Sequence, residues 1–372
     1  MLLLTLLFPL LTVCVLYFFY KKNIETWEYA LPFGVTLLSL LIGWIVIEVN
    51  ETTMTSDDEF WGDLTHKVQY YEPWDEYVSQ TCSYTTCDSE NKCTTTYYDC
   101  SYVDEHPAEY YIVGVNGTEI SVSNETYNRL SKQFQTTPIF KELNRNYHSY
   151  DGDLYEVYWD GKVETSEPIT TVHTYVNKVQ ASSNIYNFRK FTKQEVDSIG
   201  LFDYQLNQWY GNPIYGDVKN RYYNEAKTLE YINGLFGKQY QVRYHVLLFY
   251  NKDLSYGLMQ ESYWKRGNKN EMNICVGLND NNEVKWAYGF SWCDDQTYTK
   301  TLEKLISSQS VLDLKEFNEY VINNTASKWQ RKHFKDFDFL KIDVPMWCYV
   351  LTYIVAILAN GLVVYLKGYL NL

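Results

Sequence analysis

The segment QVRYHVLLFYN, residues 241–251, decides how the C-terminal half of this chain folds. Its apolar run is nearly continuous and lacks the alternation of a strand that keeps one face in water. A short run of this kind, rich in β-branched and aromatic residues, is typical of a central strand covered on both faces. We therefore predict a buried strand here, with further strands beside it and helices packed against the sheet.

The flanking segments supply those elements. The pattern predicts helices over 221–234, 254–268, 300–308 and 311–322, and strands over 271–278 and 284–293. Gly234 is expected to end the first helix as its C-cap, and the NDNNE stretch, 279–283, to join the two strands in a hairpin. Strand, helix, two strands and then helices indicate an α+β sandwich, which we place at 221–327.

The region before it, 52–176, reads as β-rich. A hairpin is predicted at 108–123, where Asn116 and Gly117 are the residue types of a two-residue type I′ turn. A helix over 124–134 should follow, and a second hairpin is expected over 154–165 with its turn at Asp160-Gly161. Residues 177–220, polar and rich in turn formers, are predicted to form a linker.

Three apolar segments, 1–20, 30–47 and 346–366, are each long enough to cross the hydrocarbon of a bilayer as a helix. Only nine residues, 21–29, separate the first two, so 1–48 should be a helical hairpin. Ser39 and Gly43 have the spacing that lets a second helix approach closely, although small residues at this spacing also arise by chance. Asn360, inside the third segment, would gain from a hydrogen bond to another helix.

Basic residues that flank short loops favour the cytoplasm. Lys21, Lys22 and Lys367 therefore place the C-terminus inside, and the N-terminus and residues 49–345 outside. The basic segment 328–345 opposes this orientation, but long translocated domains largely escape the rule. It would then lie along the membrane surface, beside anionic headgroups. The chain is thus predicted to be a multi-pass integral membrane protein with an extracytoplasmic domain.

Six cysteines fall in the predicted exterior part: Cys82, Cys87, Cys93, Cys100, Cys275 and Cys293. An even number in an oxidising space indicates disulfides, and none of the pairs has the CxxC spacing of a zinc knuckle. We expect two bonds within 82–100 and one between Cys275 and Cys293. The last has a weakness, because a hairpin centred on the NDNNE turn places Cys275 opposite Tyr288. A cytoplasmic zinc protein is the alternative.

The chain has 46 acidic and 32 basic residues, a net charge of -14. Such a balance argues against nucleic acid as a partner, because phosphate binding needs clustered lysine and arginine. Tyrosine is unusually abundant, with 37 of 372 residues. An AT-rich genome would explain this abundance, and so would a contact surface, because tyrosine offers a rigid amphipathic face. Membrane lipid and a protein partner, bound through the membrane helices or the tyrosine-rich exterior, are the partners expected.

The stretches 263–293, 70–82 and 100–111 resemble uncharacterised membrane proteins of tailed phages and bacteria, and the resemblance covers most of the exterior part. It implies no known activity. Segment 221–292 is more faintly similar to the TPM domain, a small α/β fold of membrane-tethered proteins. Trp264 and Gly267 match its Trp-Gly element loosely, whereas the acidic metal site of that domain has no clear counterpart here.

The sequence contains no GxSxG, P-loop, GxGxxG or HExxH motif, and it predicts no catalytic residue, cofactor or metal ligand. Trp264, Lys269 and Glu271 could line a ligand mouth at a strand end, although a helix end leading into a strand explains them more simply. We expect a non-enzymatic binding or assembly protein, phage-encoded and acting at a host envelope. The alternative is a TPM-like metal-dependent hydrolase, such as a phosphatase.

Overall fold

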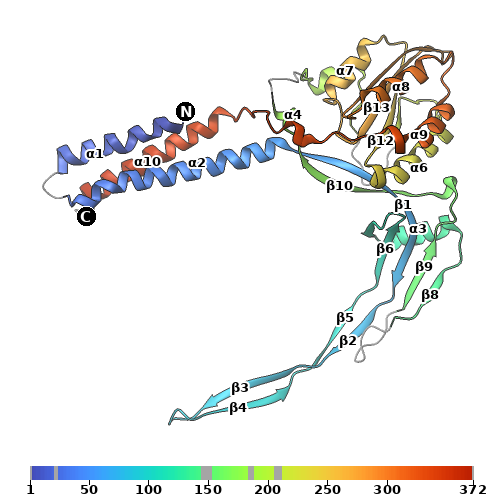
Figure 1. Ribbon diagram of the computed structural model, residues 1–372. Helices are drawn as coiled ribbons and strands as arrows, with labels where there is room; N and C mark the ends of the chain where they lie inside the picture. The colour runs from blue at the N-terminus through green and yellow to red at the C-terminus, as the bar shows by residue number, and fades with distance from the viewer. Residues whose placement is uncertain (1, 21–23, 144–152, 183–187, 205–211, 371–372) are drawn as a thin grey trace. The chain divides into compact units, whose positions relative to one another are not determined.

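The computed structural model describes the chain except residues 1, 21–23, 144–152, 183–187, 205–211 and 371–372 (Figure 1). The described chain forms two compact units. The first unit comprises Met1–Asp58, Thr174–Phe188 and His333–Leu372, and the second comprises Glu59–His173 and Arg189–Lys332. The architecture is α+β, as the sequence predicts. Lys21 and Lys22, which carry part of the orientation argument, lie outside the described residues.

The second unit contains the predicted sheet, in the order β11-β12-β13-β14. The strands are β11 (Ile214–Tyr215), β12 (Arg243–Tyr250), β13 (Glu271–Leu278) and β14 (Val284–Ser291). The first three are parallel and β14 is antiparallel to β13. Seven of the eight β12 residues are buried, which confirms the central strand expected from its apolar run.

Helices cover both faces of this sheet (Figure 1). One face packs against α6 (Tyr223–Tyr240), α8 (Gln296–Ser307) and α9 (Leu314–Lys328), whose buried residues join the strands in one apolar cluster. The other face packs against α7 (Ser255–Tyr263) through a layer of aromatic rings. Burial on both sides explains why the strand sequences are apolar throughout rather than alternating.

Two predictions in this region are wrong. The helix that was expected to end at Gly234 continues to Tyr240, and Gln241 ends it in the left-handed conformation. Gly234 instead allows close packing, because a Cβ there would lie 2.5 Å from Leu64 Cδ2. Cys275 and Cys293 are buried free thiols.

The strand register explains those free thiols. Cys275 pairs with Tyr288, as the hairpin geometry suggested. Cys293 lies beyond the end of β14, where its backbone bridges to Arg331. The proposed Cys275–Cys293 bond is therefore replaced by two separately buried thiols.

A six-stranded sheet forms the rest of the second unit's core, in the order β7-β6-β1-β9-β8, with β10 also paired to β1. Its strands are listed here: β1 (Ser56–Tyr71), β6 (Glu109–Gly114), β7 (Glu119–Ser121), β8 (Ile139–Lys141), β9 (Leu154–Tyr158) and β10 (Pro168–Val176). Helix α3 (Asn124–Phe134) has the predicted bounds and is N-capped by Ser123. Its buried residues Tyr127, Leu130 and Phe134 pack on Val68 and Ile112 of the sheet.

The two turns predicted in this region differ from expectation. The β6–β7 hairpin forms, but only Gly117 adopts a positive φ, so the connection is a three-residue turn closed by Gly114 N–H donating to Thr118 O at 2.7 Å. The buried Asp63 carboxylate favours this turn, because it accepts hydrogen bonds from the backbone and side chain of Asn116.

The second turn, at Asp160-Gly161, leads into a 3-10 turn, η4 (Val163–Thr165), and not into a paired strand. Asp160 accepts hydrogen bonds from Lys162 and Thr165, which fixes this local turn. Strand β9, which was expected to form the hairpin, pairs with β1 and β8.

Among its described residues, the first unit contains two helices long and apolar enough to cross a membrane, spanning Thr26–Thr55 and Met346–Tyr369. They correspond to α2 (Leu31–Thr55), with its leading 3-10 turn η3 (Thr26–Ala30), and α10 (Met346–Leu370). The first apolar segment forms η1 (Leu2–Leu6) and the shorter helix α1 (Leu7–Tyr20). A third membrane crossing stays a prediction.

Helices α2 and α10 pack through small and polar residues. A Cβ on Gly43 would lie 2.4 Å from the Thr352 side chain, so the predicted close approach at this position is confirmed. Asn360 donates to Thr36 Oγ1 at 2.8 Å, which is the interhelical hydrogen bond expected of an amide in an apolar segment. At the other end of the pair, Lys367 Nζ lies 2.7 Å from Glu28 Oε1.

Candidate functional site

The structure gives the three residues of the predicted ligand mouth separate contacts. Trp264 is 7% exposed and belongs to the aromatic layer under α7. Its indole N–H donates to Phe202 O at 2.7 Å, and its ring meets that of Tyr215 edge-on at 5.5 Å. These contacts make Trp264 a packing residue of the sheet.

Lys269 lies on the turn that leads into β13, and Glu271 is the first residue of that strand. The Lys269 ammonium is 3.4 Å from the Glu59 carboxylate of β1. Glu271 is fully buried, and its Oε2 accepts the Asn268 N–H at 3.0 Å, which closes the turn. Trp264 and Glu271 are thus buried in packing and turn contacts, and a ligand mouth at this strand end stays a prediction.

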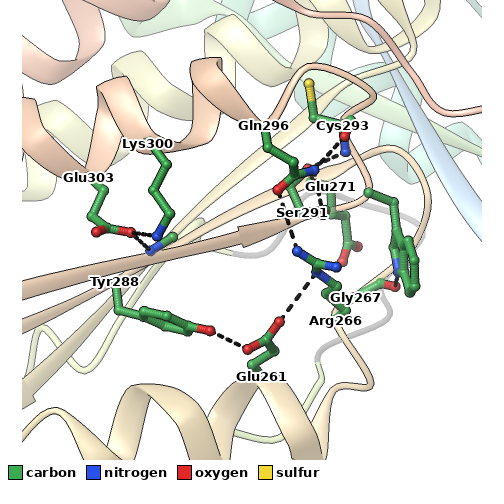
Figure 2. A network of polar contacts seen from close by, with 12 residues as sticks. Glu261, Arg266, Gly267, Glu271, Tyr288, Ser291, Cys293, Gln296, Lys300 and Glu303 are labelled. Carbon is green, nitrogen blue, oxygen red and sulfur yellow. Dashed lines mark hydrogen bonds and ion pairs between the residues drawn. The ribbon is translucent and has the colours of Figure 1, made fainter. Parts of the chain in front are cut away.

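A polar network borders this turn (Figure 2). Lys265, Arg266 and Gly267 all have positive φ, an unusual run that includes two residues with a Cβ. Arg266 Nε lies 3.3 Å from Glu261 Oε1, and its other end donates to Gln296 Oε1 at 3.4 Å. The network therefore joins α7 to the start of α8 across the strained turn.

Tyr288 extends the network onto β14 by donating to Glu261 (Figure 2). Burial raises the pKa of the Tyr288 hydroxyl, and the Glu261 carboxylate raises it further because it stabilises the protonated phenol. Tyr288 therefore stays protonated and donates to Glu261, which is already paired with Arg266, so this contact links β14 to α7. The phenol does not supply a nucleophile at neutral pH.

His245 is the most deeply buried titratable base of the sheet. Its Nδ1 lies 2.9 Å from Asn273 Oδ1. Burial, followed by the charge of Arg243, holds the pKa of His245 well below its usual range. The ring is therefore neutral at physiological pH, and its environment is that of a core histidine.

Among the residues that the structure describes, no group of three or more His, Cys, Asp or Glu side chains is placed to hold a metal ion. The metal-dependent hydrolase alternative stays a prediction.

The second candidate is a two-stranded ribbon, residues 74–106, which we call the ribbon. It consists of β2 (Trp74–Val78) paired with β5 (Tyr102–His106), continued by β3 (Thr81–Cys87) paired with β4 (Cys93–Asp99) (Figure 1). All seven residues of β4 and six of the seven in β3 are exposed. A lone hairpin of this kind is marginally stable in water, because it buries no apolar face.

Two disulfides stabilise the ribbon. Cys82 is bonded to Cys100, and Cys87 is bonded to Cys93 at the tip. Both bonds lie within 82–100, as the sequence predicts. They replace the packing that the ribbon lacks, because a cross-link lowers the entropy of the unfolded chain.

Tyrosine side chains are concentrated on the exposed ribbon. Five project from it with 42–72% of their surface exposed: Tyr77, Tyr84, Tyr97, Tyr98 and Tyr102. Tyr84 and Tyr98 lie on one face, with ring centroids 6.1 Å apart. At the base of the ribbon, His106 stacks on Trp74 at 4.1 Å. The ribbon is thus a preorganised surface of aromatic and threonine side chains. Composition had indicated a tyrosine-rich surface without locating it.

Comparison with protein-family models, curated proteins and solved structures finds no match to this chain.

Proposed function

We propose that this chain is a membrane-anchored binding or assembly protein that presents the ribbon to a protein partner outside the cytoplasm. The observation that carries the proposal is a pair of strands, β3 and β4, exposed along almost their whole length and cross-linked twice. Preorganisation reduces the entropy lost on binding. Exposed tyrosines supply large contact areas with few rotatable bonds.

The membrane arrangement is part of the proposal. Helices α2 and α10 would cross the bilayer with α1 as a third span, leaving Lys367 at the cytoplasmic side and residues 49–345 outside. Disulfides in the ribbon agree with this side, because they persist in oxidising compartments. The resemblance to phage membrane proteins suggests a host envelope as the setting.

Site-specific photocrosslinking in the native cells tests the proposal. The photoreactive residue p-benzoylphenylalanine replaces Tyr97, which is 72% exposed on the ribbon, or Tyr223, which is 54% exposed on α6. We expect a defined crosslinked protein from the ribbon position and none from the α6 position. No product at either position, or the same products at both, would overturn the binding role.

A further inference from the structure

We infer that the partner of the ribbon is a protein surface rich in lysine and arginine; this inference rests on the binding role proposed above and adds the chemistry of the partner. It starts from the register of β2 and β5. Asp75 pairs with Glu105, and Glu76 pairs with Asp104. Side chains directly opposite on antiparallel strands have Cβ atoms roughly 5 Å apart, and like charges there destabilise the pairing.

The imbalance extends along the ribbon. Residues 74–106 contain one lysine, Lys92, and seven carboxylates: Asp75, Glu76, Asp88, Glu90, Asp99, Asp104 and Glu105. His106 Nε2 lies 3.2 Å from Glu76 Oε2 and adds positive charge only when protonated. The ribbon therefore has a strong negative potential at neutral pH.

Two buried carboxylates elsewhere in the second unit are paired with cations within the fold. Glu156 on β9 is paired with Lys67 and Lys141, and Glu59 on β1 is paired with Arg331 and Lys269. These two carboxylates thus have cations beside them, whereas the register of β2 and β5 places acidic residues opposite one another. A pairing that is unfavourable in the isolated chain becomes favourable once external cations lie against it.

Three other occupants fit less well. The described residues contain no cluster of ligands that could hold a metal ion. A second copy of the chain would bring the same negative charges, and anionic headgroups would be repelled. Lysine and arginine side chains suit both features of the ribbon, because they pair with carboxylates and also bind the faces of exposed tyrosine rings.

The charge requirement can be measured on the full chain in nanodiscs of phosphatidylcholine, with decalysine and decaglutamate peptides as probes. We expect binding of decalysine only. The Asp75→Asn/Glu105→Gln variant should weaken it by about five-fold or more, because two facing carboxylates are lost. The control variant Glu316→Gln/Glu319→Gln removes the same charge from exposed positions on α9 and should change it by less than about two-fold. Equal weakening in both variants would overturn the inference.

Hydrogen exchange of the Asp75→Asn/Glu105→Gln variant shows whether the ribbon is still folded. Removing the facing carboxylates relieves repulsion, so the ribbon amides should exchange with solvent no faster than in the wild type. Weaker binding with retained protection identifies lost charge, and not lost structure, as the cause. Faster exchange in the variant would contradict the claim that the facing carboxylates repel one another.

The crosslinking experiment separates this inference from the binding role. A ribbon crosslink whose yield falls in Asp75→Asn/Glu105→Gln, and falls again in about 500 mM salt, supports the cationic partner. A crosslink to another protein that is insensitive to both changes, or a crosslink to a second copy of the chain, keeps the binding role and overturns the cationic partner. If the wild-type chain forms no crosslink at the ribbon position, the binding role itself is overturned.

Discussion

The sheet around β12 and the ribbon are stabilised by different interactions, and their cysteines show the difference. Cys275 and Cys293 are 0% and 1% exposed in the packed sheet, and both are free thiols. The four ribbon cysteines lie where there is no core, and all are bonded. Covalent links are therefore found where apolar burial cannot hold the chain, and they are absent from the part that has a core of its own.

The largest effect should come from truncating the core. Phe317 on α9 is fully buried against the sheet, so Phe317→Ala should lower the free energy of unfolding by about 3–5 kcal/mol. Tyr97→Ala on the ribbon should lower it by less than about 0.5 kcal/mol, because the ring is exposed. Urea unfolding of the detergent-solubilised chain measures both variants. Similar losses in the free energy of unfolding would contradict the claim that only the sheet is stabilised by a buried core.

Removing a disulfide should have the second largest effect, confined to the ribbon. Cys82→Ser/Cys100→Ser opens a cross-link between residues 18 apart and should make local opening easier by about 3 kcal/mol. Hydrogen exchange of the ribbon amides should accelerate, while the β12 and β13 amides keep their protection. Acceleration in the sheet, or none in the ribbon, would contradict a ribbon stabilised by its own bonds.

Adding a methyl group where α6 packs closely on β1 should lower the stability by a smaller amount. A Cβ on Gly237 would lie 2.2 Å from the backbone nitrogen of Gly62, so Gly237→Ala should cost about 1–3 kcal/mol. Gly234→Ala is the matched control on the same helix. Its nearest neighbour is the side chain of Leu64, which can move, so the loss should be smaller. Thermal melts of the two variants should rank them in this order, and the reverse order would contradict the close contact between α6 and β1.

The smallest effect concerns the pH dependence of stability and comes from His245 in the sheet around β12. His245 has a lowered pKa when folded, so the unfolded chain binds its proton first and stability falls as pH drops below about 6.5. The loss relative to His245→Gln should reach at most about 1.4 kcal/mol per pH unit. Unfolding midpoints at pH 7.5 and 5.5 measure it. A constant difference between the two proteins at these pH values would show that His245 is not buried as a neutral base.

The sequence predicts this molecule well where local patterns decide the structure. Strand β13 and helix α3 have their expected bounds, because apolar periodicity and the Ser123 cap are local signals. Two disulfides among the four ribbon cysteines are expected from their close spacing, and the structure supplies the pairing that the sequence left open. Gly234 was misread as a helix end because its role depends on Leu64, a residue far away in the chain.

The same limit applies to the candidate site. The abundance of tyrosine indicated a contact surface, but only strand pairing shows that five tyrosines are exposed on one ribbon. The facing carboxylates could not be predicted from the sequence either, because Asp75 and Glu105 become neighbours only through the register of β2 and β5. Trp264 looked like a mouth residue and is part of the core, since the pattern could not show the aromatic layer around it.

The most direct test of the contrast between sheet and ribbon is the thiol status of the purified full chain, read by mass spectrometry without reductant after alkylation under native and denaturing conditions. We predict two linked peptide pairs, Cys82–Cys100 and Cys87–Cys93, with Cys275 and Cys293 alkylated only after denaturation. Four ribbon cysteines alkylated in the native protein, or a Cys275–Cys293 link, would contradict the account.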